Sequence, residues 1–254
     1  MIKISVITVC YNAKATLEDT LRSVQEQSYN NIEHILIDGA SSDGTVDIIR
    51  KNERRLAYWI SEPDQGIYDA MNKGIQQATG DLIGFLNADD IFENNMVLGW
   101  IAEAFSERDI NACYGDLVYV NRADSTRIVR YYRSKHFTPA RIAYGVMPAH
   151  PTLYLTKDIF KKFGLFRTDY RIAADFEFIA RIFGKQMIKF HYIPKVLIKM
   201  RTGGVSTRNI KSNFIINQEI VRACFENNIP TSLFKVYLKY FKKIFEFVQK
   251  RALL

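Results

Sequence analysis

The sequence contains little cysteine, and the cysteines it has are scattered. Cys10, Cys113 and Cys224 are the three cysteines in 254 residues, and none of them belongs to a Cys-x-x-Cys pair. An odd number of isolated cysteines argues against a disulfide framework and against a structural zinc site. We therefore expect a protein of a reducing compartment, by default the cytoplasm.

Long hydrophobic runs are also missing. No stretch approaches the roughly 18 uncharged apolar residues that a membrane-spanning helix needs. The apolar run after Met1 is too short for the apolar region of a signal peptide together with its cleavage site. We expect neither a spanning helix nor a secretory leader. Hydrophobic residues make up 48% and charged residues 24% of the chain, which is ordinary for globular proteins with a sizeable core.

Two common phosphate-binding motifs are absent. No Gly-x-x-x-x-Gly-Lys-Ser/Thr sequence occurs, which argues against a Walker-type nucleotidase. No Gly-x-Gly-x-x-Gly follows the first predicted strand either, where the chain instead reads Cys10-Tyr11-Asn12-Ala13. This turn argues against a dinucleotide-dependent dehydrogenase. A nucleotide can still bind at the sheet edge, with Tyr11 facing a base and Asp38 accepting from a base N–H or a ribose hydroxyl, whereas the alternative for Tyr11 is ordinary packing at a strand end.

The charge is divided unevenly along the chain. The net charge is +8, but residues 1–100 carry 8 basic and 15 acidic side chains, whereas residues 101–254 carry 27 basic and 12 acidic ones. An acidic part with a net charge of −7 therefore precedes a basic part with a net charge of +15. A basic protein invites the hypothesis of nucleic-acid binding, but this division suggests that the two parts face different partners.

The first hundred residues alternate between strand and helix patterns. Strands are predicted at 2–10, 32–37, 56–60 and 81–86, and helices at 15–27, 45–49, 68–78 and 95–105. This alternation predicts βαβ units with a mostly parallel sheet. The pattern then loosens, with strands predicted at 112–120, 126–132 and 187–193, helices at 139–144, 156–163, 175–183, 212–226 and 233–250, and a loop at 199–208.

Acidic residues follow three of the first four predicted strands. Asp38 ends the second strand, Glu62 and Asp64 follow the third, and Asp89-Asp90 follow the fourth. In an open α/β sheet, ligands bind beyond the carboxyl ends of parallel strands. Crowded carboxylates repel one another unless a cation lies among them, and a divalent metal with oxygen ligands satisfies this need. The competing interpretation is that such residues cap the next helix, and for Asp43 the two interpretations stay open.

Three segments in order resemble one family. SVITVCYN, IEHILIDGASSDGT and SEPDQGIYDAMNKGIQQATGDLIGFLNADD are similar to family 2 glycosyltransferases of the GT-A fold, especially bacterial enzymes of O-antigen, capsule or exopolysaccharide synthesis. The resemblance spans about residues 1–200. It implies an α/β fold with a Rossmann-like, mostly parallel central sheet. We expect a catalytic domain at 1–205, with a donor half at 1–100 and an acceptor half at 101–205, followed by a basic helical extension at 206–254.

The resemblance also implies a donor site for a nucleoside-diphosphate sugar, with UDP as the expected nucleotide. The DxD position, where carboxylates hold Mg²⁺ or Mn²⁺ against the donor diphosphate, is Asn87-Ala88-Asp89. Asp89 is the metal candidate, with Asp90 assisting, because Asn87 replaces the first acid by a weaker amide ligand. The remaining donor-site residues implied by the family are Thr8, Tyr11, Asn12, Asp38, Asp64, Gly66, Asp69 and Lys73.

The family's catalytic base aligns with Asp175 in RIAADFEFIAR. Ala174 replaces the acidic neighbour that many relatives carry, and Glu177 points to a different face of the helix. An inverting transfer needs one base to deprotonate the acceptor hydroxyl and a cation to stabilise the leaving diphosphate. A glycosidase instead needs two carboxylates that flank the glycosidic bond. The acidic cluster therefore favours transfer, and the alternative for Asp175 is an N-cap.

Three further residues are candidates for acceptor or phosphate contacts. His150, in MPAHPTLYL, lies where relatives often carry a histidine, and the alternative is a buried structural histidine. Arg181 and Arg201 are suited to a phosphate, with Arg201 preceding a Gly203-Gly204 loop that could close on the donor. The alternative for both arginines is a structural ion pair.

The segment 231–254 combines basic and apolar residues at helical spacing, which is typical of an interfacial membrane helix. Peripheral attachment to the inner face of the membrane would suit a saccharide acceptor linked to a polyprenyl diphosphate, and the alternative is a helix packed on the domain.

Two other functions stay open. One is a catalytically inactive sugar-nucleotide-binding or assembly subunit, suggested by Asn87 and Ala174. The other is nucleic-acid binding, which the acidic first part and the lack of a known module disfavour.

Overall fold

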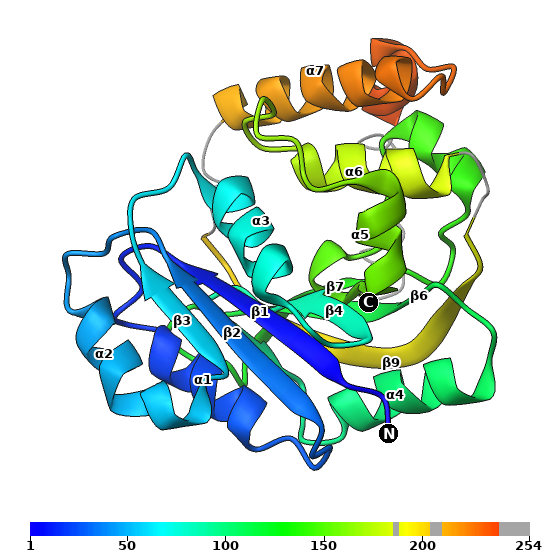
Figure 1. Cartoon of the computed structure of the whole chain (residues 1–254). Coiled ribbons are helices and arrows are strands. Elements are labelled where there is room, and N and C mark those ends of the chain that lie inside the picture. Colours follow the sequence, from blue (N-terminus) through cyan, green and yellow to red (C-terminus); the bar gives the residue numbers. More distant parts are fainter. Residues whose placement is uncertain (185–187, 204–209, 239–254) are drawn as a thin grey trace, which may run out of the picture. The chain divides into compact units, whose positions relative to one another are not determined.

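The computed structural model describes residues 1–184, 188–203 and 210–238, which form two compact units (Figure 1). The first unit comprises Met1–His136, Pro148–Thr168 and Ile188–Gly203. The second comprises Phe137–Met147, Asp169–Met187 and Gly204–Leu254. The two units are thus interleaved along the chain. No helix within the described ranges has the length and apolarity needed to cross a membrane.

The first unit is built on one mixed sheet of nine strands among the described residues. Their order is β3-β2-β1-β4-β8-β6-β9-β5, and β7 pairs with β6 beside this path. The strands are β1 (Ile4–Cys10), β2 (Ile32–Asp38), β3 (Tyr58–Ser61), β4 (Leu82–Phe85), β5 (Asp90–Phe92), β6 (Ala112–Val120), β7 (Ile128–Tyr132), β8 (Tyr154–Thr156) and β9 (Phe190–Arg201). The first four are mutually parallel, as their helical connections predict.

Helices cover both faces of this sheet. Figure 1 shows α1 (Leu17–Gln25), α2 (Thr45–Asn52) and α4 (Val97–Glu107) on one face and α3 (Ile67–Gln77) on the other. α1 buries Leu17, Leu21 and Val24, the one-sided spacing that made it predictable. α3 approaches β1 closely at Gly74, where a Cβ would lie 2.4 Å from Cγ2 of Ile7. The short helices η1 (Glu53–Arg55), η3 (His150–Thr152) and α5 (Lys157–Phe163) complete the unit.

The predicted sequence of strands and helices is confirmed for the first hundred residues except for the short β5, and β8 was missed as well. β5 and β8 have only three residues each, too few for a periodic signal. The loop prediction is wrong for Lys199–Arg201, because β9 continues through Pro194 to Arg201. The register between β9 and β6 shifts between Tyr114 and Asp116 of β6, opposite Pro194. Pro194 has no backbone N–H to donate, so it lies where the hydrogen bonding between the two strands is already irregular.

The second unit is helical. It contains η2 (Pro139–Tyr144), α6 (Ala174–Phe183) and α7 (Ile210–Glu226), followed by helical residues 233–238. Glu219 on α7 accepts hydrogen bonds from the backbone N–H groups of Arg171, Ile172 and Ala173 at 2.7, 3.0 and 2.8 Å. The half-buried Glu219 of α7 therefore fixes the turn that leads into α6. The predicted helix at 233–250 is described only as far as residue 238, and its remainder lies outside the described residues.

Candidate active site

The carboxyl ends of β1, β2 and β4 meet at one edge of the sheet, as the sequence predicted. The Gly39 N–H donates to the Cys10 carbonyl at 2.9 Å, and the Ala88 N–H donates to the Val9 carbonyl at 3.3 Å. A Cβ on Gly39 would lie 2.4 Å from Oδ2 of Asp64 and 3.5 Å from Cδ2 of Tyr11. Residues from four separate segments of the first unit therefore converge on this edge.

Asp38 is completely buried at this edge, and its carboxylate accepts hydrogen bonds from neighbouring residues of the protein. Its Oδ1 accepts from the Ser41 hydroxyl at 2.5 Å and from the Cys10 thiol at 3.3 Å. Its Oδ2 accepts from the Ser41 N–H at 2.9 Å and from the Ser61 hydroxyl at 2.6 Å. Four donors match the acceptor capacity of a carboxylate. Asp38 thus holds the loop after β2 and the end of β3 together.

Asn12 and Tyr11 form the turn after β1. Asn12 adopts a left-handed backbone with φ of 50°, which asparagine tolerates better than most residues. Its N–H donates to the Ser41 hydroxyl at 2.7 Å, and its side-chain oxygen accepts from the Ser42 N–H at 3.0 Å. The Tyr11 side chain beside it is 68% exposed. The turn therefore presents an aromatic ring to solvent on a backbone that is fixed by hydrogen bonds.

Thr8 points into the protein. It is fully buried, and its hydroxyl lies 2.9 Å from Nε2 of His34 on β2. The Nδ1 atom of His34 is buried without a hydrogen bond among the described residues. Burial lowers the pKa of His34 to about 4, because the charged ring would lose its hydration.

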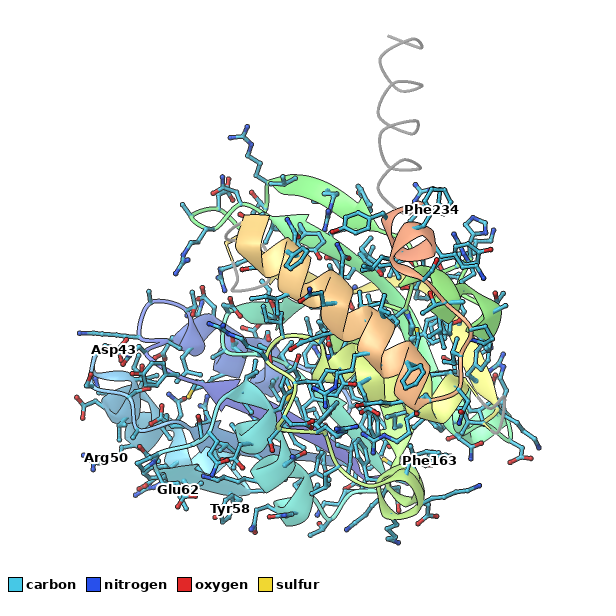
Figure 2. All side chains as sticks on the ribbon, turned by 90° about the horizontal axis from the view of Figure 1, so that it is seen from above. Asp43, Arg50, Tyr58, Glu62, Phe163 and Phe234 are labelled. Atoms are coloured by element: carbon cyan, nitrogen blue, oxygen red, sulfur yellow. The ribbon has the colours of Figure 1, made fainter. Side chains whose placement is uncertain are left out.

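The loop before α3 brings Asp64, Asp69 and Lys73 together. Asp64 accepts from the Gly66 N–H at 2.8 Å, and Asp69 accepts from the Gln65 N–H at 3.1 Å. Gly66 has φ of 114°, a conformation that favours glycine. Lys73 pairs with Glu62 at 2.7 Å (Glu62 is labelled in Figure 2) and lies 3.7 Å from Asp69. The hydrogen bond to Glu62 raises the pKa of Lys73, so this lysine remains charged.

The residues Asn87–Asp90, which we call the acidic turn, connect β4 to β5. The Asp90 N–H donates to the Asn87 carbonyl at 2.9 Å. The Asp90 side chain is fully buried, and among the described residues its carboxylate is approached only by the Asn87 side chain and the Arg201 N–H, neither of which reaches hydrogen-bond geometry. The side-chain oxygen of Asn87 is buried and unpaired in the same sense. Burial, reinforced by the charge of Asp89, raises the pKa of Asp90 well above its ordinary value.

Asp89 is partly buried in the same turn. Burial raises its pKa, and the positive charges of Arg201 and Arg122 oppose that shift. The two adjacent acids are therefore compensated only in part by these arginines, and their charged forms stay disfavoured.

Side chains of α1 and β9 hold the acidic turn in place through hydrogen bonds to its backbone carbonyls. The Thr20 hydroxyl donates to the Asp90 carbonyl at 2.8 Å. Arg201 donates to the Asp89 carbonyl at 3.1 Å and pairs with Asp19 at 2.6 Å. Arg201, which the sequence suggested as a phosphate ligand, is thus buried in an ion pair with Asp19 that supports the turn.

The donor set of the acidic turn fits a divalent metal ion. Asp89, Asp90 and Asn87 offer oxygens, the ligands that Mg²⁺ and Mn²⁺ prefer, and the buried oxygens of Asp90 and Asn87 lack other partners. Among the described residues, no group of three or more His, Cys, Asp or Glu side chains is placed so that it could hold a metal ion by itself. A metal ion at the acidic turn would therefore need further ligands, and substrate phosphates commonly supply them.

Asp175 lies in the second unit, at the second position of α6. The helix begins at Ala174, and its N-cap is Ala173 without a side-chain cap, so Asp175 is not the N-cap. Asp175 Oδ1 accepts from the Phe176 N–H at 2.8 Å, and the helix N-terminus favours its negative charge. Glu177 is buried and binds Arg181 through two hydrogen bonds of 3.2 and 2.7 Å. Arg181 is thus occupied by a structural pair.

His150 is buried in an aromatic cluster of the first unit. Its ring lies 5.7 Å from the ring of Phe85 in a stacked arrangement and 5.8 Å from the ring of Phe166, edge to face. Phe166 is itself fixed by Asn72, which exchanges hydrogen bonds of 2.8 and 2.9 Å with its backbone. His150 therefore has the surroundings of a packed core histidine adjoining the end of β4.

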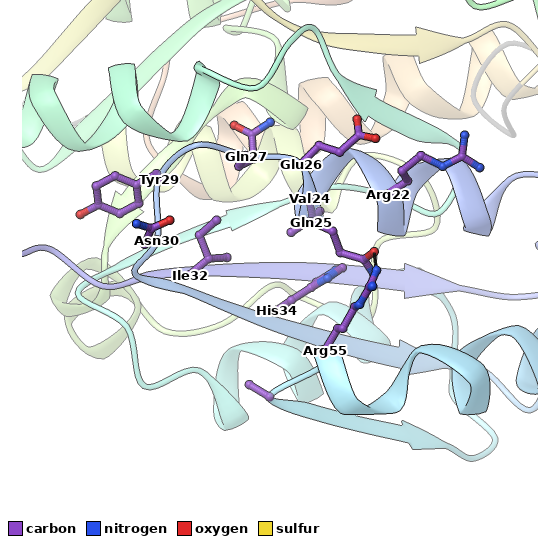
Figure 3. Close-up of a pocket in the computed structure, with 11 residues that line it drawn as sticks. Arg22, Val24, Gln25, Glu26, Gln27, Tyr29, Asn30, Ile32, His34 and Arg55 are labelled. Atoms are coloured by element: carbon purple, nitrogen blue, oxygen red, sulfur yellow. Dashed lines mark hydrogen bonds between the residues drawn. The ribbon is translucent and has the colours of Figure 1, made fainter.

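A cavity of about 540 Å³ lies away from this edge, beside the amino ends of β2 and β3 (Figure 3). Its lining includes Ile32, Ala57, His34, Gln25 and Arg55, and no candidate site residue lines it. Ligands of such sheets bind at the carboxyl ends, so this cavity lies at the opposite end of the strands from the candidate site.

Sequence reasoning missed the residues that support the site. Ser41 and Ser61 bind Asp38, and Asp19 and Thr20 hold the acidic turn. Each contact joins segments that are distant or unpatterned in sequence, so no local signal marked these residues.

Comparison with known proteins identifies relatives for most of the chain. A family model described as "Glycosyl transferase family 2" matches residues 5–170. An uncharacterized glycosyltransferase of Mycobacterium tuberculosis is 37% identical over 181 residues, which cover 70% of this chain and 68% of the relative. A PGL/p-HBAD biosynthesis glycosyltransferase of the same species is 28% identical over 218 residues, covering 83% and 82%.

Solved structures share the fold. Staphylococcus aureus TarS (residues 1–349) in complex with UDP-GlcNAc superposes with a TM-score of 0.70 at 20% identity and covers 87% of this chain. This chain spans 66% of that structure, just under two thirds of its length. A mannosyltransferase of Pyrobaculum calidifontis in complex with GDP-Man and Mn²⁺ gives a TM-score of 0.67 at 19% identity, covering 93% of this chain and 70% of the other. The predicted GT-A fold is thereby confirmed.

Proposed function

Because the chain belongs to glycosyl transferase family 2, we propose that it moves a sugar, with inversion, from a nucleoside-diphosphate sugar to a saccharide acceptor of a bacterial surface glycan. UDP is the proposed nucleotide, supported by the TarS complex with UDP-GlcNAc. The neighbour with GDP-Man shows that the fold also accommodates another nucleotide.

The acidic turn carries this proposal. It places two carboxylates with raised pKa values and several unpaired buried oxygens at the carboxyl end of β4. Asp89 and Asp90 would hold Mn²⁺ or Mg²⁺, with Asn87 contributing its amide oxygen or contacting the donor. When bound, such an ion supplies Lewis-acid stabilisation of the charge on the leaving diphosphate. The Mn²⁺-bound mannosyltransferase supports this assignment.

The loops around the acidic turn would bind the donor. The exposed ring of Tyr11 offers a stacking surface for the base, and Asn12 fixes that ring's backbone. Asp64, Gly66 and Asp69 shape the loop before α3. The charged Lys73 adds a cation beside these acids, which suits a phosphate or a sugar hydroxyl.

We assign Asp175 as the general base. It lies in the first turn of α6, where the helix N-terminus favours a negative charge, and this suits a group that takes a proton from an acceptor hydroxyl. Glu177 is unsuitable for this role because Arg181 and Asn227 occupy its carboxylate.

We further propose a lipid-linked acceptor and peripheral membrane contact through residues 231–254. The described part of this segment exposes Phe234 to 72% (labelled in Figure 2), together with Leu233, Tyr237 and Leu238, beside the half-buried Lys235. Exposed aromatic groups beside a basic group on one short helix suit the interface of an anionic bilayer.

Release of nucleoside diphosphate from a panel of nucleotide sugars, measured with Mn²⁺ and a saccharide acceptor, tests the proposal. Turnover that chelation abolishes and Asp175→Asn reduces at least a hundredfold would support it. Donor binding without any turnover would favour an inactive sugar-nucleotide-binding subunit, the alternative that Asn87 and Ala174 suggest.

A further inference from the structure

The strands β6 and β7 form a hairpin that projects apolar side chains into solvent. β7 is exposed along almost its whole length, with Ile128, Val129 and Tyr131 exposed to 43%, 57% and 53%. β7 pairs with β6 and with no other strand of the described residues. We call residues 121–135 the β7 hairpin tip. An exposed apolar edge strand invites association, so this surface calls for a partner.

The β7 hairpin tip is also strongly basic. It carries Arg122, Arg127, Arg130, Arg133 and Lys135 against the single acid Asp124. The Asp124 carboxylate is taken up by the turn, where it accepts from the Thr126 N–H at 2.9 Å and hydroxyl at 2.6 Å. None of the five cations has an ion pair among the described contacts, although Arg130 lies over the Tyr119 ring at 4.0 Å and the charge of Arg122 also acts on Asp89.

The geometry of β7 presents these residues as a rigid surface. Tyr119 pairs with Arg130 and Val120 with Ile128, so Val129 is the extra residue of a bulge. The backbone is closed at the tip by the bond from the Asn121 N–H to the Arg127 carbonyl at 2.9 Å. A bulge at a sheet edge hinders pairing with another strand. Pairing with a second copy would also bring like-charged arginines together.

We propose that the β7 hairpin tip is a second membrane contact, which binds an anionic lipid surface. Arginines at the rim would meet lipid headgroups, and the exposed Ile128, Val129 and Tyr131 would enter the interface. A nucleic acid would also attract the arginines, but it offers no apolar environment for three exposed hydrophobic side chains. The proposal does not depend on sugar transfer and adds to the contact already proposed for residues 231–254.

The test is binding of the full chain to vesicles of neutral lipid or of neutral lipid with about a third anionic lipid, with donor and acceptor absent. The charge variant is Arg127→Gln with Arg133→Gln, which leaves the stacked Arg130 in place. Each basic residue near such a surface contributes about fivefold, so the pair should weaken anionic-vesicle binding about thirtyfold. The matched control, Lys51→Gln with Arg54→Gln, removes two exposed charges elsewhere in the same unit and should change binding less than threefold.

A second measurement reports insertion directly. The native cysteines are buried, so Val129→Cys offers a selective position for an environment-sensitive fluorophore. Its emission should shift to the blue with anionic vesicles, whereas the same label at Lys51→Cys should not respond. The proposal fails if the charge variant binds vesicles like its control, or if the label at position 129 stays in water while the protein is bound. It also fails if a DNA duplex protects the label and anionic vesicles do not.

Discussion

Asp90→Asn should stabilise the metal-free protein while removing its response to metal. The Asp90 carboxylate is fully buried, and neither oxygen makes a hydrogen bond of good geometry. A buried polar group without a partner costs about 1–3 kcal/mol, and a charged one costs more. The amide has nearly the same shape and stays polar but carries no charge, so the substitution removes only the extra cost of the charge, and we expect a gain of about 1 kcal/mol or more in the free energy of unfolding at pH 8. For a chain of this size each kcal/mol raises Tm by about 2–4 °C.

The sign of the pH dependence follows from the raised pKa of Asp90. The unfolded chain ionises this group near pH 4, whereas the folded protein resists ionisation. The cost is therefore absent at low pH and grows as pH rises from about 4 to the folded-state pKa. The advantage of Asp90→Asn over wild type should be larger at pH 8 than at pH 5.

Urea unfolding in EDTA at both pH values measures this effect. Asp109→Asn serves as the control because Asp109 is highly exposed, and such substitutions change stability by about 0.5 kcal/mol or less. Mn²⁺ should then raise the Tm of wild type and of the control but not of Asp90→Asn. Asp90→Asn that is less stable than wild type in EDTA at pH 8 would refute the reasoning, because the Asp90 carboxylate would then stabilise the folded protein without any metal ion.

Four further outcomes are expected. Asp175→Asn should abolish transfer but leave donor affinity within about threefold by calorimetry, and normal turnover would remove Asp175 as the base. His34 has a pKa of about 4 in the folded protein and about 6.5 in the unfolded chain, so the free energy of unfolding should fall by up to about 3 kcal/mol as pH falls from 6.5 to 4. In urea titrations, His34→Gln should show a smaller fall over the same pH range. Arg201→Gln should weaken Mn²⁺ binding measured by electron paramagnetic resonance, because it releases the Asp89 carbonyl and Asp19, and unchanged affinity would contradict the supporting role. Removing residues 239–254 should lower binding to anionic vesicles several-fold, and equal binding would exclude this tail as an anchor.

Much of the donor half could be predicted because its signals are local. The alternation of strand and helix patterns predicted that β1 to β4 run parallel, although not their order in the sheet, and apolar strands ending in acids marked the edge where Asp64 and Asp89 lie. A run such as LIGFLNADD combines a buried strand with the acidic turn in nine residues, so short-range reasoning was sufficient there.

The partners of those residues could not be predicted, because they depend on long-range packing. Asp38 was expected to face a nucleotide, but Ser61, which lies 23 residues further on, and Ser41 occupy its oxygens. Its contact with a donor stays a prediction, as does that of Thr8, whose hydroxyl lies against His34. Arg201 was expected in a loop, but the bulge opposite Pro194 lets β9 continue and deliver this arginine to the acidic turn.

Thermal denaturation with a panel of nucleoside-diphosphate sugars and Mn²⁺, on wild type and on Asp89→Ala, tests the central claim most directly. A true donor at a hundred times its Kd stabilises the folded state by about 2.7 kcal/mol. We predict that at least one nucleotide sugar raises the Tm of wild type by several degrees only when Mn²⁺ is present. Asp89→Ala should lose this shift. A panel without any stabilising donor, or a shift that Asp89→Ala retains in full, would contradict it.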